Sequence, residues 1–166
     1  MITLENSVDI AVPPQEAFDY LSDLRNEAEW NPRMRSVRLL TPGPVAAGSR
    51  YQARWAGGPD TVVEYTRFDR PDGWASTGHS AGMTIRFSAR VAPAPPGSRL
   101  TVRMELIPRG LARLLQPLLR RRMQGRELDN MRAIKNTMES LPTVRGRRRS
   151  GCTRLADRPA AAGTSS

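Results

Sequence analysis

The fold is decided by residues 2–21, which read ITLENSVDIAVPPQEAFDYL. In the first half of this stretch apolar side chains alternate with polar ones, and one face collects Ile2, Leu4, Val8, Ile10 and Val12. A period of two predicts a half-buried β-strand over residues 2–12. Pro13 and Pro14 end the strand, and Pro14 suits the first turn of a helix over residues 14–22. The chain therefore begins with a strand that leads directly into a helix.

Outward from this segment the pattern stays regular. A second short helix is predicted over residues 24–30 and ends at Asn31, because the residue before a proline avoids the helical region. From residue 36 the chain returns to period two, with turn residues between the alternating runs. The six further strands are predicted at residues 37–41, 50–55, 61–69, 74–80, 83–91 and 100–106.

The segment from Arg109 to Pro142 has the apolar spacing of one long helix. Pro117 should kink or restart this helix, because proline lacks a backbone N–H group. Strands in one long run, with the helices kept apart from them, predict an α+β fold with a mostly antiparallel sheet.

Charge divides the chain into two parts. Its 166 residues carry a net charge of +10, with 26 Lys and Arg against 16 Asp and Glu. Residues 142–166 hold six arginines and one acid, and they lack any periodicity. We therefore expect a ligand-binding domain over residues 1–141 and a disordered, basic Arg/Ala/Ser tail over residues 142–166. The tail has no interleaved aromatic residues, so it predicts weak contact with anionic surfaces and no specific nucleic-acid partner.

Several classes of protein are disfavoured by the sequence. Cys152 is the only cysteine and His79 the only histidine, so neither a disulfide framework nor a metal site is expected. No stretch approaches the length of a membrane span, and the N-terminus does not resemble a signal peptide, which predicts a cytoplasmic protein. Phosphate-binding loops, dinucleotide fingerprints and nucleophile elbows are all missing, so we expect no cofactor.

Five segments in this order carry a family resemblance. They are residues 10–21 (IAVPPQEAFDYL), Asp23-Leu24 followed by residues 29–32 (EWNP), residues 48–51 (GSRY), residues 68–71 (FDRP) and residues 97–102 (GSRLTV). The sequence thereby resembles the START-like (SRPBCC) superfamily over about residues 2–141, in particular its polyketide cyclase/dehydrase-like branch. The resemblance implies a helix-grip fold, in which a curved seven-stranded antiparallel sheet wraps around a long C-terminal helix and leaves a deep cavity.

A cavity is also expected on physical grounds. A curved sheet around one helix cannot fill its whole concave face with side chains of modest size, and the space left is a mostly apolar pocket. Methionine suits such a wall because its thioether is flexible and polarizable. The candidate ligand-binding residues on inward-facing positions are Trp30, Tyr51, Trp55, Tyr65, Met83, Ile85, Phe87, Val102, Met104, Leu119, Arg120, Met123 and Glu127.

Whether the aromatic candidates contact a ligand depends on which face of the sheet they occupy and on the hydrogen-bond partners of their polar groups. Tyr65 has an ambiguous parity, because either Val62 or Val63 satisfies an inward face. A buried Tyr or Trp also needs a hydrogen-bond partner for its polar group, and a ligand could supply it.

Two residues are weak catalytic candidates, His79 and Glu127. His79 faces the cavity if the turn before Met83 has three residues, and faces solvent if the turn has two. Glu127 lies on the apolar face of the last helix, where a carboxylate needs a partner or a raised pKa. In the alternative, Glu127 emerges at the cavity rim beside Arg120 or Arg126.

Three functions remain open at this point. The first is binding of a small hydrophobic molecule that is polyketide-, lipid- or aromatic-like. The second, suggested by the resemblance, is a cyclase/aromatase-type enzyme that steers aldol cyclisation and dehydration by positioning and acid–base help. The third is a non-catalytic interaction module with a basic tail. Two or more polar groups converging in an open cavity would favour the enzyme, and a filled cavity would favour the module.

Deletion of residues 142–166 should leave the melting temperature of the protein nearly unchanged, because this segment offers almost no large apolar side chain to a core. Differential scanning calorimetry of the full and shortened chains measures the effect. A large drop in the melting temperature would place the domain boundary further toward the C-terminus.

Overall fold

The structure, a computed structural model, describes residues 1–80, 82–109 and 116–141. The strands are β1 (Ile2–Ile10), β2 (Met34–Leu39), β3 (Arg50–Trp55), β4 (Asp60–Asp69), β5 (Gly73–Ser80), β6 (Met83–Ala94) and β7 (Gly97–Pro108). The helices are α1 (Pro14–Leu21), the 3-10 helix η1 (Leu24–Asn26), α2 (Glu27–Trp30) and α3 (Gln116–Ser140).

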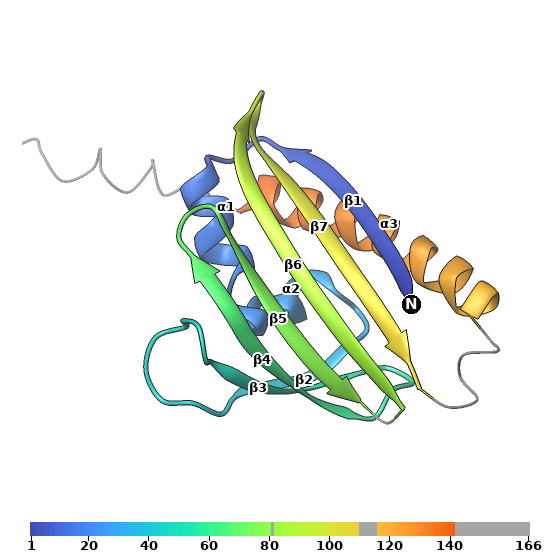
Figure 1. The fold of residues 1–166 in the computed structure, drawn as a ribbon. Coiled ribbons are helices and arrows are strands. Elements are labelled where there is room, and N and C mark those ends of the chain that lie inside the picture. Colours follow the sequence, from blue (N-terminus) through green and yellow to red (C-terminus); the bar gives the residue numbers. More distant parts are fainter. Residues whose placement is uncertain (81, 110–115, 142–166) are drawn as a thin grey trace, which may run out of the picture.

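The strands form one antiparallel sheet in the order β1-β7-β6-β5-β4-β3-β2. The N-terminal strand therefore pairs with the last strand, and β1 and β2 are the two edges. Figure 1 shows the long strands curving past α3, with α1 and α2 inserted after β1. This is the predicted α+β helix-grip fold, so the fold class is confirmed.

Strand boundaries differ from the prediction by a few residues. β1 ends at Ile10 and not at Val12, whose carbonyl accepts a hydrogen bond of 2.8 Å from the Ser98 hydroxyl. β6 and β7 are longer than predicted, because Pro93 still pairs with Ser98 near their shared turn. A proline is tolerated there because it lies at the end of its strand and gives up little of the ladder.

The long helix begins at Gln116, so Pro117 lies in its first turn. A missing N–H costs little in a first turn. The predicted kink or restart at Pro117 depends on the residues before Gln116, and it stays a prediction. Residues 110–115 and the predicted tail, 142–166, lie outside the described residues. In the described part of the chain, no helix combines the length and apolar character needed to cross a membrane.

Two apolar clusters join the sheet to the helices. The larger one contains Phe18 of α1, Trp74 and Leu100 of the sheet, and Ile134 and Met138 of α3. The smaller one is built from Ile2, Leu4 and Leu106, with Met83, Ile85, Met104 and Met123 packed against it. The C-terminal half of α3 therefore packs into the larger cluster, and Met123 reaches the smaller one.

Candidate functional site

A cavity of about 520 Å³ lies between the sheet and the helices. Its walls come from β3 to β7, from the segment containing η1 and α2, and from α3. The apolar part of the lining is formed by Leu21, Leu24, Trp30, Trp55, Val63, Trp74, Met83, Ile85, Phe87, Leu100, Val102, Met104, Met123, Met131 and Ile134. Such a concave, mostly apolar space has the size and character of a small-molecule site.

Small residues in β5 help to keep this space open. Gly78 and Ser76 lie on the inner face between larger neighbours and contribute little volume. A Cβ atom at Gly78 would meet Thr61, Val63 and Ile85 only at ordinary contact distances of 3.4–3.9 Å. The absence of a side chain at Gly78 is therefore a local cause of the hollow, and no close backbone approach requires a glycine there.

Glu27, the first residue of α2, places a carboxyl group in the cavity wall. Its Oε1 accepts hydrogen bonds from Trp55 Nε1 at 2.8 Å and from Asn31 Nδ2 at 2.5 Å. Removal of this carboxyl from water raises its pKa, and the two donors act in the opposite direction. The network holds Glu27 in one orientation between α2 and β3.

Glu127 brings a second carboxyl group to the cavity from α3. The residue is 5% exposed, and its one described hydrogen bond is a long one, 3.4 Å from Asn130 Nδ2 to Oε1. Burial raises the pKa of Glu127, and the charge of Glu27 raises it further. The charge of Glu27 on α2 therefore acts on the ionisation of Glu127 on α3.

Neither carboxyl group has a counterion from the protein among the described residues. Each ion pair in that part of the chain joins other side chains. Arg33 also lines the cavity, but its guanidinium donates to the Ala56 carbonyl. Arg126 lines it too, and contacts the Met123 sulfur at 3.8 Å. The otherwise mostly apolar wall thus carries two carboxyl groups, from Glu27 and Glu127, and two arginines, Arg33 and Arg126.

The buried aromatic side chains obtain their polar partners from the protein. The Tyr65 hydroxyl donates to the Ser22 carbonyl at 2.8 Å, and the Tyr51 hydroxyl donates to Asp23 at 3.4 Å. Burial raises the pKa of both phenols above the ordinary range, so both stay neutral. Together with the Trp55–Glu27 bond, these contacts supply the partners that the sequence analysis left to a ligand.

Most of the predicted ligand-binding residues meet at this cavity. They are Trp30, Trp55, Tyr65, Met83, Ile85, Phe87, Val102, Met104, Met123 and Glu127. The ambiguous parity of Tyr65 is resolved, because Val63 and Tyr65 are buried and Val62 is 37% exposed. Glu127 lines the cavity and is 5% exposed; Arg126 lines the same cavity, and Arg120 is not among its lining residues.

Four of the named residues are placed elsewhere or not described. His79 is exposed because the turn to Met83 has two residues, Ser80 pairing with Met83. Arg120 is exposed in the early part of α3, which extends past the start of β1 (Figure 1). Tyr51 is fully buried in the larger cluster and does not line the cavity. The side chain of Leu119 lies outside the described residues.

Sequence reasoning missed Glu27 and its partner Asn31. The two residues are four positions apart, a spacing that places side chains on one face of a helix. This spacing could have drawn attention to the pair, since Glu27 lies in the predicted helix and Asn31 at its predicted end. Among the described residues, no group of three or more His, Cys, Asp or Glu side chains is arranged to hold a metal ion.

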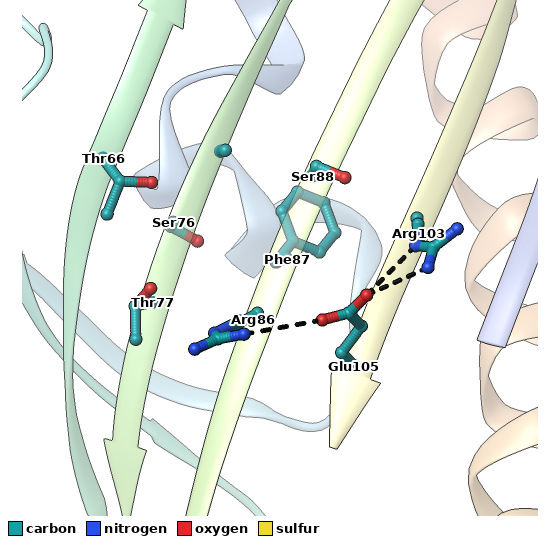
Figure 2. A pocket seen from close by; sticks show the side chains of 9 residues that line it. Thr66, Ser76, Thr77, Arg86, Phe87, Ser88, Arg103 and Glu105 are labelled. Atoms are coloured by element: carbon teal, nitrogen blue, oxygen red, sulfur yellow. Dashed lines mark hydrogen bonds and ion pairs between the residues drawn. The ribbon is translucent and has the colours of Figure 1, made fainter. Parts of the chain in front are cut away.

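A second hollow, of about 310 Å³, lies on the opposite face of the sheet (Figure 2). The side chains of Arg86, Arg103 and Glu105 have the opposite parity to those of the cavity-lining strand residues. Glu105 pairs with Arg103 at 3.0 Å and with Arg86 at 4.0 Å. These charged groups partner one another at the surface, so the chemistry of the enclosed cavity is not repeated there.

The Glu127→Gln variant should gain stability relative to the wild type as the pH rises. The folded-state pKa of Glu127 is raised above the ordinary value of 4.5, so ionisation above that pH disfavours the folded state. Glutamine cannot ionise, so the variant does not lose stability in this way, and its side chain has nearly the same size. Urea unfolding between about pH 4.5 and pH 8 measures the difference, and each unit of pKa difference corresponds to about 1.4 kcal/mol.

The matched control is Asp129→Asn, at an exposed position of the same helix. Its stability relative to the wild type should lack this rise with pH. An equal effect of Glu127→Gln at both ends of the pH range would show that the carboxyl is not desolvated.

Comparison with known proteins agrees with this geometry. Residues 1–139 match the family described as polyketide cyclase/dehydrase and lipid transport. Uncharacterized protein Rv1546 of Mycobacterium tuberculosis is 31% identical over 115 residues, which cover 67% of this chain and 80% of that protein. The structure of the di-domain ARO/CYC BexL from the BE-7585A biosynthetic pathway has a TM-score of 0.68 at 14% identity, covering 85% of this chain and 51% of BexL. A START superfamily protein from Mycobacterium smegmatis has a TM-score of 0.67 at 14% identity, covering 84% and 99%. The chain therefore belongs to the polyketide cyclase/dehydrase and lipid transport family and has its START-like fold.

Proposed function

We propose that this protein binds one small hydrophobic molecule, polyketide-, lipid- or aromatic-like, in the cavity between the sheet and α3. The observation that carries the proposal is the cavity of about 520 Å³ with its apolar lining. Membership of a family that includes lipid transport supports the same conclusion.

The energetics of this wall fit an apolar guest. A molecule that buries about 300 Å² of apolar surface gains roughly 7.5 kcal/mol, at about 25 cal/mol per Å². This gain exceeds the lower estimates, about 4 kcal/mol, for the freedom lost on association. Flexible side chains such as Met83, Met104 and Met123 allow the wall to adapt to guests of different shape.

A second candidate function is that of a cyclase/dehydrase-type enzyme. The convergence of Glu27 and Glu127 in one cavity favours it, since two carboxyl groups with unlike hydrogen bonding can serve as acid and base. The relative BexL is itself named as an ARO/CYC protein. The candidates are distinguished by mass spectrometry after incubation with a poly-β-ketone. A binding protein returns it unchanged, and a cyclase returns a product that has lost water.

The Gly78→Leu variant should bind the neutral fluorescent probe diphenylhexatriene about tenfold or more weakly than the wild type, because the new side chain occupies the cavity. Fluorescence titration gives the affinity, and the melting temperature monitors folding. A folded Gly78→Leu protein that binds the probe as well as the wild type would contradict the proposed site.

The matched control is Thr77→Leu, the neighbouring position of β5, whose side chain faces the outer hollow. It adds an equally apolar side chain to the opposite face of the sheet. Probe binding by Thr77→Leu should therefore equal that of the wild type, and an equal loss in both variants would indicate a general effect on the strand.

A further inference from the structure

The cavity combines an apolar body with one acidic position. Glu27 on α2 and Glu127 on α3 both line it, and α2 contacts α3 directly. Oε1 of Glu27 accepts two hydrogen bonds, but Oε2 accepts none from the described residues. Oε2 of Glu127 likewise accepts none from them, although the residue is 5% exposed. Two carboxylate oxygens, one on each residue, are therefore left for a guest.

A carboxylate in a cavity wall without a counterion is unfavourable, because it has given up part of its hydration and gained no opposite charge. A neutral guest supplies no opposite charge, so the carboxylate stays unfavourable when such a guest is bound. A guest with a cationic group provides both the missing charge and hydrogen-bond donors, and hydrogen bonds between ionised groups are stronger than neutral ones. The unpaired oxygens thus favour a donor group on the guest.

We propose that the natural ligand is an amine with an apolar body, and that its ammonium group is bound between Glu27 and Glu127. The inference rests on the proposed function and narrows it to a chemical class. The apolar body contacts the methionine and aromatic walls. The ammonium group donates to the two carboxylate oxygens that the protein leaves open.

The other charged and titratable groups around this pair have partners of their own. Tyr65 on β4 donates to the Ser22 carbonyl, and Arg33 after α2 donates to the Ala56 carbonyl. Asp23, before η1, pairs with Arg25 at 2.6 Å. Arg126 on α3 contacts Met123. The direct contacts of a bound ammonium group are therefore the two carboxyl groups.

The net charge of +10 acts against a cationic guest at long range. Salt screens this repulsion beyond about 8–10 Å at physiological ionic strength. A contact pair inside the cavity is screened much less. The local carboxyl groups therefore dominate recognition, and association should become faster at higher salt.

The experiment is isothermal titration calorimetry with three probes of the same ring size: naphthylmethylamine, naphthylmethanol and naphthoate. At about pH 7.5 the amine should bind about tenfold or more tightly than the alcohol, and naphthoate more weakly than both. Burial raises the pKa of both carboxyl groups, so amine binding should release protons. Titrations in two buffers of different ionisation enthalpy detect this release, which the alcohol should not produce.

Glu27→Gln and Glu127→Gln should each remove most of the preference for the amine over the alcohol, measured as the ratio of the two affinities in the same variant. The control Asp129→Asn removes the same charge from an exposed position of α3 and should keep the preference. Equal amine and alcohol affinities in the wild type would overturn the inference while leaving the proposed hydrophobic site intact. Tightest binding of naphthoate, or a preference that survives both glutamine variants, would also overturn it. Binding of no probe would count against the proposed function itself.

Discussion

The structure depends on uneven packing between α3 and the sheet. Where Met138 of α3 and Phe18 of α1 join the larger apolar cluster, the helices and the sheet are packed together. Elsewhere β5 contributes Gly78 to the inner face, and the layers enclose a cavity of about 520 Å³. Protein interiors are normally close-packed, so a cavity of this size gives up dispersion energy that a filled core would gain. The larger cluster supplies the stability that allows the remaining space to stay open.

The cavity in turn determines the chemistry of Glu27 and Glu127. The same carboxyl groups on an outer surface would be hydrated, and their pKa values would not be raised by burial. In the cavity wall, ionisation of either carboxyl group at neutral pH lowers the free energy of unfolding. Trp55 and Asn31 reduce that cost for Glu27, and one long contact from Asn130 does little for Glu127. Groups that weaken the folded state in this way are typical of functional sites.

The architecture was predictable from the sequence because one face of each strand is buried. Alternation located all seven strands, and the apolar spacing after Arg109 located the last helix, which is described from Gln116 to Ser140. The orientation of a side chain was not predictable where it depends on the exact length of a turn or on the position of a residue along a helix. The orientation of His79 depended on a turn of two residues or three. Arg120 has almost the same helical direction as Glu127, but it lies about 10 Å further along the helix axis and is exposed.

Glu27 shows where sequence reasoning stops. Its importance comes from Trp55, which is 28 positions away and reaches it only because β3 lies beside α2. No local pattern contains that contact. Glu127, by contrast, stood out because it interrupts an apolar helix face, and such an interruption is visible without any tertiary information.

The most direct test of the account is NMR of the protein labelled at its methionine methyl groups, titrated with diphenylhexatriene. Methionine occurs both in the cavity wall and away from it, so the spectrum itself locates the guest. A guest in the cavity should shift the signals of Met83, Met104 and Met123, which line it, and leave those of Met34 and Met138, which are buried elsewhere, unchanged. Shifts confined to Met34 and Met138, or no shift at saturating probe, would contradict an open cavity between the sheet and α3.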